Sequence, residues 1–295
     1  MNNLKFSIII PTYNRADLIG KTIKSILNQT YTDFEIIVVD DGSTDDTEQV
    51  VLSIKDDKIK YFKKKNEERA VARNYGAKIA NGEYVNFFDS DDIAFENHLD
   101  EANKLIDKHN KPAIFHLAYE WVTPEGKVFK TKNKFYGNIN KQLVKANIFS
   151  CNGVFIRKDI ILENLFNEDR ELSASEDWEL WLRLSVKYKW YFSNVVTSQI
   201  VDHDARSVLS INKENLIKRK ELFLKYTLEN SDVAKFIGKQ KKKFIANAYS
   251  YVSLHLILAK YKRDGFKYYF KTIKQCPRFL FTRRNFAILK HLIIL

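Results

Sequence analysis

Three carboxylates follow a buried strand pattern in the segment YVNFFDSDDIAF, residues 84–95. The five residues before Asp89 are apolar or aromatic except for one amide, which predicts a strand covered on both faces. In an extended chain, residues two apart point to the same side, so Asp89 and Asp91 can aim at one point. Carboxylates this close raise each other's pKa unless a positive group lies between them. The pair therefore suits a hard divalent cation, Mg²⁺ or Mn²⁺, although a solvated acidic turn or a helix N-cap has the same pattern.

Phosphates are the ligands that such a metal would share with the protein. The chain contains no GxxxxGK[ST] motif, and no GxGxxG follows Ile10 or Asp40. We therefore expect a metal, and not a glycine-rich loop, to hold any phosphates. A metal that bridges a diphosphate stabilises the negative charge that develops when the diphosphate leaves.

Two further groups follow strand or helix patterns that could position them at a ligand. Asp40 and Asp41 end a hydrophobic run and precede Gly42, so either could accept a hydrogen bond from a base or a ribose; Asp-Gly-Ser is also ordinary turn chemistry. Arg73 lies among small residues of a predicted helix, which would let it reach a phosphate across a close contact between helix and sheet. A surface ion pair is the alternative for this arginine.

Asp177 stands in the first turn of a predicted helix that also carries two tryptophans. A carboxylate near a helix N-terminus is stabilised as the anion, as a general base requires, although simple compensation of the helix dipole explains the same placement. His203, in VDHDARS, is a candidate ligand of a metal or a phosphate, and a structural histidine is the alternative.

The elements that must position these groups alternate along the first hundred residues. Strand patterns over 6–10, 34–41, 58–62 and 84–88 are separated by helical patterns. This alternation predicts an α/β fold in which helices cover both faces of a mostly parallel sheet. Ligands of such sheets bind outside the carboxyl ends of the strands, which here read PTYNR, VVDDGST and FFDSDD.

The pattern changes after residue 112. We expect a hairpin at 123–127, a helix near 138–146, a helix over 175–188 and a strand that ends near His203. From about residue 210 onward the pattern is helical, basic and aromatic.

Composition limits the class of protein. The 295 residues are 45% hydrophobic, enough for one large core or about two domains. Cys151 and Cys276 have neither disulfide-scaffold nor metal-type spacing, which indicates a reduced cytosolic compartment. The start MNNLKFSIIIP is too short for a signal peptide, and no run approaches the roughly 18 apolar residues that a spanning helix needs.

The net charge of +12 is unevenly distributed. Residues 206–295 carry 21 Lys and Arg against 5 Asp and Glu, whereas the rest carries 28 against 32. The chain is therefore a mildly acidic part joined to a strongly basic one. Nucleic acid, an anionic membrane surface or a polyanionic ligand could each meet such a tail.

The order of the motifs is more specific than any one of them. PTYNR, VVDDGS, A-x-A-R-N, FFDSDD, EDWELWLRL and H-x-x-x-S (His203, Ser207) together closely resemble the inverting family 2 glycosyltransferases, over residues 4–210. The resemblance implies a GT-A fold, Rossmann-like and flanked by helices, with a basic C-terminal helical extension. We expect a catalytic domain over 1–210, with a nucleotide-sugar half at about 1–110 and an acceptor half at about 111–210, followed by the helical region 211–295.

The resemblance also assigns roles to residues. Those expected around the nucleotide are Pro11, Tyr13, Asn14, Asp40, Asp41, Arg73, Asp89 and Ser90, with Asp41 as the partner of the base. Asp89 and Asp91 would form the DxD pair that binds Mn²⁺ or Mg²⁺, with Asp91 the more direct ligand and His203 a further one. Asp177 would be the catalytic base. UDP is the expected nucleotide, and dTDP and GDP are used in the same family.

The mechanism implied by the resemblance is a single transfer with inversion. Asp177 would deprotonate an acceptor hydroxyl, which attacks the anomeric carbon opposite the nucleotide. Processive relatives carry a QxxRW motif and membrane helices, and this sequence has neither. We expect single additions to a glycan or a lipid-linked saccharide, in the synthesis of surface polysaccharide or lipo-oligosaccharide.

The basic C-terminal region requires its own interpretation. Residues 262–295 interleave Lys and Arg with aromatic and aliphatic side chains, the composition of a helix that lies on an anionic membrane surface. A helical subdomain with a solvated basic face, or an oligomer contact, is the alternative. We expect a cytoplasmic protein, with peripheral attachment to the inner face of the cell membrane as the extension of that hypothesis.

Three other functions compete with transfer. A nucleotide-sugar-binding or scaffold protein without turnover would not need Asp89, Asp91 and Asp177 together. A nucleic-acid binder fits the pI near 9.4, but the sequence has no recognisable nucleic-acid module, and we expect no such partner. A nucleotidyltransferase would show a glycine-rich Arg-Lys signature where this chain has PTYNR.

Overall fold

The computed structural model describes residues 4–203 and 212–294 of the chain. Ser207 and the expected domain boundary at 210 lie outside these residues. By their contacts, the described residues divide into two compact units. The first unit comprises residues 4–139, 149–170 and 188–203, and the second comprises 140–148, 171–187 and 212–294. The functional division at 210 stays a prediction.

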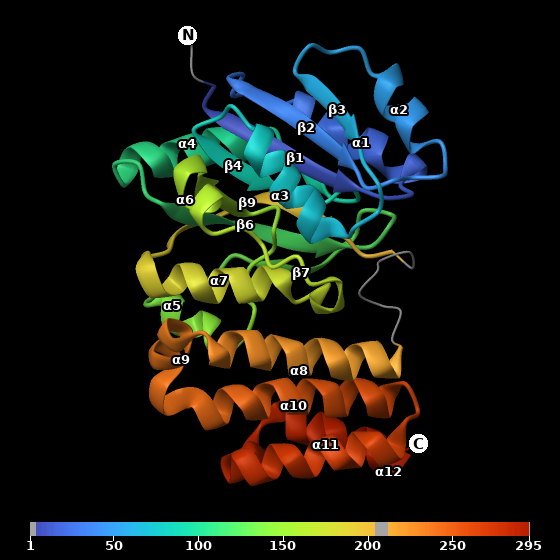
Figure 1. Ribbon diagram of the computed structural model, residues 1–295, viewed down its shortest axis with the longest axis vertical. Helices are drawn as coiled ribbons and strands as arrows, with labels where there is room; N and C mark the ends of the chain where they lie inside the picture. The colour runs from blue at the N-terminus through green and yellow to red at the C-terminus, as the bar shows by residue number, and fades with distance from the viewer. Residues whose placement is uncertain (1–3, 204–211, 295) are drawn as a thin grey trace. The chain divides into compact units, whose positions relative to one another are not determined.

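Within the first unit, the described residues form one nine-stranded sheet (Figure 1). The strands are β1 Phe6–Thr12, β2 Phe34–Asp40, β3 Ile59–Lys63, β4 Tyr84–Phe87, β5 Ile93–Ala94, β6 Ile114–Val122, β7 Val128–Lys132, β8 Val154–Arg157 and β9 Tyr191–Val201. Their order is β3-β2-β1-β4-β8-β6-β9-β5, and β7 pairs with β6. The expected hairpin is present between β6 and β7, where Thr123 N donates to Lys127 O at 3.0 Å.

The sheet is mostly parallel, as the alternating pattern predicts. β3, β2, β1 and β4 are parallel neighbours, and every residue of β1, β2 and β4 is buried. Burial on both faces is the reason that these strands are mostly apolar, with the buried Ser7, Glu35 and Asn86 as polar exceptions in their interiors. β8 is antiparallel to both β4 and β6, and β9 is parallel to β6. Six of the nine strands therefore share one direction, and β5, β7 and β8 oppose it.

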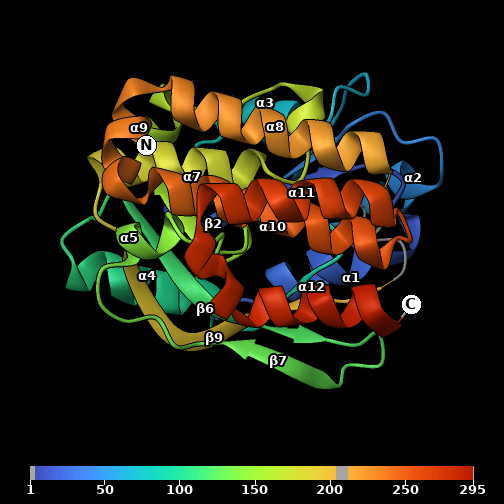
Figure 2. The ribbon, with the colours of Figure 1, turned by 90° about the horizontal axis from the view of Figure 1, so that it is seen from below.

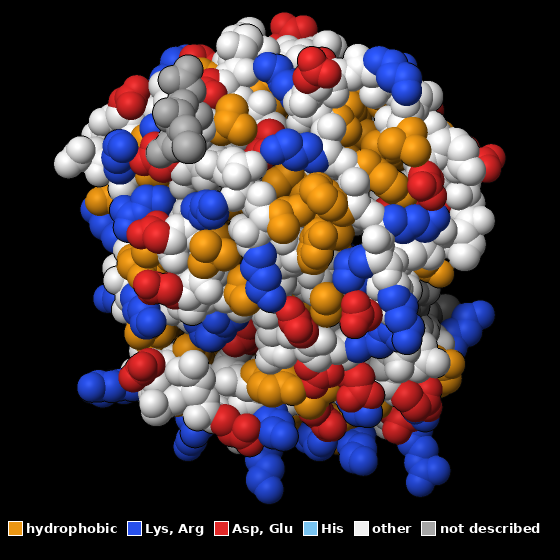
Figure 3. Space-filling model, turned by 45° about the horizontal axis from the view of Figure 1, so that its top comes forward, with side chains coloured by type: hydrophobic (Ala, Val, Ile, Leu, Met, Phe, Trp, Pro, Cys, Tyr) orange, Lys and Arg blue, Asp and Glu red, His pale blue; other side chains and the backbone are white. Residues whose placement is uncertain are grey.

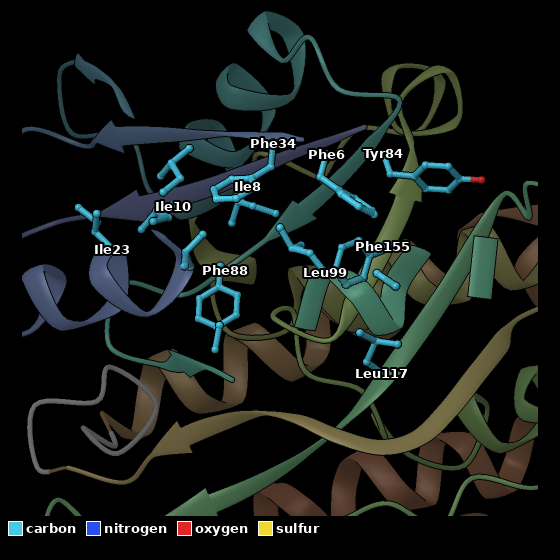
Figure 4. Packing of buried hydrophobic residues seen from close by; sticks show 14 of the residues in the cluster. Phe6, Ile8, Ile10, Ile23, Phe34, Tyr84, Phe88, Leu99, Leu117 and Phe155 are labelled. Carbon is cyan, nitrogen blue, oxygen red and sulfur yellow. The ribbon is translucent and has the colours of Figure 1, made fainter. Parts of the chain in front are cut away.

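Helices cover both faces of this sheet. Those of the first unit are α1 Ala16–Leu27, α2 Thr47–Ser53, α3 Arg69–Ile79, α4 His98–Lys108 and α6 Lys158–Glu163. Ile8 and Ile10 of β1 pack in one core cluster with Ile23 of α1 and Leu99 of α4 (Figure 4). Ile9 points to the opposite face, because side chains alternate along a strand, and there it meets α3. A Cβ at Gly76 would lie 2.4 Å from Ile9 Cγ2, so α3 approaches the sheet closely.

The second unit is helical. Its elements are α7 Glu176–Lys187, α8 Lys213–Glu229, α9 Ser231–Ile237, α10 Lys241–Leu258, α11 Lys262–Gln275 and α12 Arg283–Ile294, with short 3-10 turns η2 Gly238–Gln240 and η3 Pro277–Phe281. The 3-10 turn η1 Arg170–Leu172 begins at the last residue of the first unit's middle segment. The helix expected near 138–146 is the shorter α5 Ile139–Leu143, at the boundary of the two units. α7 packs on α8 and α9, and α10 packs on α11 and α12 (Figure 2). No helix among the described residues is long and apolar enough to cross a lipid bilayer.

Candidate functional site

The carboxyl ends of β1, β2 and β4 lie at one edge of the sheet, because these strands are parallel neighbours. Thr12 pairs with Asp40 at the ends of β1 and β2, and Asp41 N donates to Thr12 O at 2.8 Å. Pro11 lies within β1, one residue before its end. Phe88 N donates to Ile9 O at 2.9 Å, which fixes the chain just before Asp89. The three polar motifs therefore meet where the sequence predicts a site.

Hydrogen bonds join the loop after β1 to the loop after β2. Asn14 has a positive φ of 51°, a conformation that Asn tolerates better than most residues. Its backbone N–H donates to Ser43 Oγ at 2.9 Å, and its side-chain oxygen accepts from Thr44 N at 2.8 Å. Tyr13, next to this anchor, is 46% exposed, so its ring is accessible to a planar ligand.

Asp40 is fully buried and holds the turn that follows β2. Its Oδ1 accepts from Ser43 N at 2.7 Å, and its Oδ2 accepts from the Tyr61 hydroxyl at 2.5 Å. Burial, together with the hydrogen bond to Asp40, raises the pKa of Tyr61 well above its usual value. Asp40 thus has a structural task that the sequence pattern does not reveal, and contact with a nucleotide stays a prediction.

Asp41 is also buried and organises the loop that leads into α3. It accepts from Lys64 Nζ at 2.9 Å, from Glu67 N at 3.0 Å and from Glu68 N at 2.8 Å. A carboxylate offers about four acceptor positions, so these bonds leave about one for a ligand. The role of Asp41 as partner of a base stays a prediction.

Arg73, which is buried, forms an ion pair with the first aspartate of the DxD segment, whose side chain is 37% exposed. The Arg73 side chain is 2% exposed, its Nη2 lies 2.8 Å from Asp89 Oδ1, and its guanidinium carbon lies 5.3 Å from the centre of the Phe166 ring. The surface ion pair weighed for this arginine is wrong in its location, because α3 contacts the sheet closely enough to bury the guanidinium. A protein cation therefore neutralises Asp89, beside the buried Ser90.

Asp91 has different partners. His203 Nε2 lies 3.1 Å from Asp91 Oδ2, although the two residues are 112 apart in the chain, and Arg15 Nε lies 3.8 Å from the same oxygen. The side chains of Asp91 and His203 are 16% and 12% exposed, so a ligand can reach them. Sequence reasoning did not single out Arg15, and its signal was its place at the end of PTYNR.

The donor atoms at Asp91 and His203 fit a divalent metal. A carboxylate oxygen and an imidazole nitrogen suit Mn²⁺, which shares its remaining positions with water and phosphate oxygens. Among the described residues, no group of three or more His, Cys, Asp or Glu could hold a metal. The protein would therefore contribute Asp91 and His203, and a ligand would complete the site. Asp89, which is paired with Arg73, stays a prediction as a further metal ligand.

Asp92, the third carboxylate of the segment, accepts a hydrogen bond from the end of β9. Its Oδ2 accepts from Asn152 Nδ2 at 3.1 Å, and its Oδ1 accepts from Val201 N at 3.1 Å. Val201 is the last residue of β9 and lies two positions before His203. Asp92 therefore helps to position His203, a role that the sequence did not predict.

Asp177 belongs to the second unit, and the other predicted site residues belong to the first. It lies in the first turn of α7, as expected, and is half-buried. Its Oδ2 accepts from Asn147 Nδ2 at 2.8 Å, and its Oδ1 accepts from Trp178 N at 2.7 Å. Asn147 was not identified from the sequence, because nothing local marks it. The base role of Asp177 stays a prediction.

A buried lysine lies behind the start of α7. Lys220 of α8 donates to Ser175 Oγ at 2.8 Å, and its Nζ lies 4.8 to 5.8 Å from the ring centres of Trp178, Phe223 and Tyr251. Burial lowers the pKa of Lys220 to about 8. This cation supports the turn that precedes Asp177, and no local pattern in the sequence predicts the contact.

A mostly parallel sheet covered on both faces, with acidic and polar loops at its carboxyl edge, is the arrangement that the expected GT-A fold requires. The model of Glycosyl transferase family 2 matches residues 7–164, more than half of the chain. The chain belongs to this family.

Curated relatives support the same family. An uncharacterized glycosyltransferase of Rickettsia bellii is 35% identical over 243 residues, 80% of this chain and 34% of that protein. The GalNAc(5)-diNAcBac-PP-undecaprenol beta-1,3-glucosyltransferase of Campylobacter jejuni is 31% identical over 282 residues, 91% of this chain and 88% of the relative. The chain spans about a third of the length of the rickettsial protein.

Solved structures match the fold. S. aureus TarS 1-349 in complex with UDP-GlcNAc has a TM-score of 0.65 and 20% identity, covering 92% of this chain and 89% of that one. Mannosyltransferase PcManGT from Pyrobaculum calidifontis, in complex with GDP-Man and Mn2+, has a TM-score of 0.59 and 17% identity, covering 98% and 87%. At these identities the match shows the GT-A fold.

Proposed function

We propose that this protein transfers a single sugar from a nucleotide-sugar donor to a hydroxyl of a glycan or lipid-linked acceptor. The observation that carries the proposal is the pair of Asp91 and His203, 3.1 Å apart at the carboxyl edge of a family 2 sheet. A divalent metal held there would supply positive charge to the diphosphate of the donor as it leaves. Two fold neighbours are in complex with UDP-GlcNAc and with GDP-Man, and we propose a UDP-sugar here.

The residues around the metal pair have separate tasks in this proposal. The ring of Tyr13 stacks on the base, and the anchored Asn14 keeps that ring at the edge of the sheet. Arg15, 3.8 Å from Asp91, faces the phosphates. Arg73 holds Asp89 in its turn and so fixes the backbone that presents Asp91.

The chemical step moves one proton and one glycosyl group. Asp177 accepts the proton of the acceptor hydroxyl, and that oxygen bonds to the anomeric carbon from the face opposite the nucleotide. The bond between the anomeric carbon and the phosphate oxygen breaks, and the nucleoside diphosphate leaves with the electron pair. The product therefore has inverted configuration at the anomeric carbon. Asn147 and the N–H of Trp178 hold the carboxylate in place for this role.

A lipid-linked glycan is the acceptor that we propose. The Campylobacter jejuni relative is named for a glycan on undecaprenyl diphosphate, and it aligns over most of both chains. Such an acceptor would give the enzyme a task in the synthesis of surface glycans at the cytoplasmic face of the membrane.

A transfer assay tests the proposal. The protein is incubated with a panel of nucleotide sugars, a polyprenyl-linked saccharide and Mn²⁺, and the product is analysed by mass spectrometry for mass and by NMR for anomeric configuration. We expect addition of one sugar from one donor class with inversion. A product chain of many sugars, or retention of configuration, would contradict the proposal.

A further inference from the structure

The outer side of α11 carries a stripe in which phenylalanine alternates with basic residues. The exposed positions follow helical spacing along one side of the helix: Arg263, Phe266, Lys267, Phe270 and Lys274. Phe266 and Phe270 are 43% and 65% exposed, and their ring centres lie 6.4 Å apart. The next two elements, η3 and α12, continue the same composition.

In η3, Leu280 is 41% exposed and Phe281 is 85% exposed. On α12, Arg283, Phe286 and Lys290 follow one another at helical spacing, and Phe286 is 62% exposed. We call the exposed side chains of α11, η3 and α12 the basic aromatic face. Its members are Arg263, Phe266, Lys267, Phe270, Lys274, Arg278, Leu280, Phe281, Arg283, Phe286 and Lys290.

The same three elements also have a buried side, and a different set of apolar residues forms it. Tyr269 of α11, Phe279 of η3 and Ile288 of α12 pack in one cluster with Ile257 of α10. Figure 2 shows α11 and α12 lying in front of α10. The helices therefore bury one apolar side and still present large apolar side chains on the other, which a merely solvated face would not require.

The charge of this segment has one sign. Residues 265–295 contain seven Lys and Arg and no Asp or Glu. The preceding acid, Asp264, lies 3.0 Å from Lys213 Nζ of α8, and Glu221 of α8 lies 4.0 Å from Lys271 Nζ. By contrast, acidic and basic side chains are interspersed on the face shown in Figure 3.

We propose that the basic aromatic face binds the surface of an anionic lipid membrane. Phenylalanine and leucine side chains enter the boundary between headgroups and acyl chains, while lysine and arginine pair with anionic headgroups. A second copy of the chain is a poor occupant, because two faces of the same charge repel each other. Nucleic acid offers charge and stacking, but it offers no apolar medium for Leu280, whereas a membrane accepts the rings and the aliphatic chain together.

This inference does not rest on the proposed function, since its readout is membrane binding and not turnover. The full chain is mixed with vesicles of phosphatidylcholine, with and without phosphatidylglycerol, and the bound fraction is measured by flotation at low and high ionic strength. We expect binding that requires phosphatidylglycerol and weakens with salt.

Two variants of the basic aromatic face separate the contribution of its rings to membrane binding from the contribution of its charges. The ring variant replaces three exposed rings: Phe270→Ser, Phe281→Ser and Phe286→Ser. Its control is Phe129→Ser on β7, where the native ring is 53% exposed. The charge variant keeps all rings and replaces Lys267, Lys274, Arg283 and Lys290 by Gln. Its control replaces the exposed Lys21, Lys24, Lys55 and Lys127 of the first unit by Gln, with the same change of net charge.

We expect the ring variant to lose about tenfold in partition coefficient for each ring, and the charge variant about fivefold for each cation. Each control should bind as the native protein does. The charge variant provides an independent test if the ring variant does not fold. Native binding by a folded face variant, or an equal loss in its control, would overturn the proposal. So would binding of a single-stranded oligonucleotide that is tighter than vesicle binding and is lost in the same variants, or self-association that the variants abolish.

Discussion

Replacement of Lys220 by Met tests whether a desolvated cation lies behind the turn that carries Asp177. The native ammonium is nearly fully buried, donates to Ser175 and faces three aromatic rings. Burial lowers its pKa from 10.5 to about 8. A lysine with a lowered pKa in the folded state destabilises the protein wherever it is charged in both states, which here means below about pH 8.

The magnitude follows from the same pKa. At about 1.4 kcal/mol for each pH unit, this lysine lowers the free energy of unfolding by roughly 3 kcal/mol below pH 8, and the loss disappears as the pH rises to 10.5. Replacement by Met removes this loss in the free energy of unfolding, because the side chain carries no charge. It also removes a hydrogen bond of about 1 kcal/mol and cation–π contacts of about 1 kcal/mol. We therefore expect the stability of the variant at pH 7 to lie within about 1 kcal/mol of that of the native protein, on the side of the variant.

Urea denaturation at pH 7 and pH 10.5 measures the effect. The free energy of unfolding of Lys220→Met, minus that of the native protein, should fall by roughly 3 kcal/mol between the two pH values. The control is Lys225→Met, an exposed position of the same helix, for which we expect no such difference. An equal difference at both pH values for Lys220→Met would refute the account of a buried charge.

Three further predictions concern the site. Arg73→Met removes the buried partner of Asp89; we expect a loss of about 2 kcal/mol in thermal or urea unfolding, and unchanged stability would mean that the pair contributes nothing. His203→Ala should weaken Mn²⁺-dependent nucleotide binding at least about tenfold in calorimetry without unfolding the protein, and native affinity would remove it from the metal site. Asp177→Asn should abolish transfer and leave donor binding intact, with Asn147→Ala giving a partial loss of turnover at similar donor affinity; native turnover of Asp177→Asn would exclude it as the base.

The parallel half of the fold could be predicted because its signal is local. Each of the strands β1, β2 and β4 is buried along its whole length, so each is a mostly apolar run, and helical periods separate them. The other half could not be predicted in detail. The insertion of β8 between β4 and β6, antiparallel to both, depends on pairing between segments far apart in the chain.

The site shows the same limit at the level of side chains. Motif order marked Asp91 and His203, and the structure brings them to 3.1 Å. Hydrogen-bond partners that are far apart in the chain meet only in the folded structure. The sequence therefore did not reveal that Arg73 neutralises Asp89 or that Asp92 binds the end of β9. Asn147 could not be predicted for the same reason. It donates to Asp177, in the first turn of α7, from a loop thirty residues earlier in the chain.

The most direct test of the central claim is calorimetric titration of the purified protein with a panel of nucleotides and nucleotide sugars, with Mn²⁺ and with a chelator. We predict that one nucleotide class binds, that binding requires the metal, and that Asp91→Asn loses it. If no nucleotide binds, or if one binds equally well with the chelator and in Asp91→Asn, the assignment of a metal-dependent donor site at the carboxyl edge of this sheet is wrong.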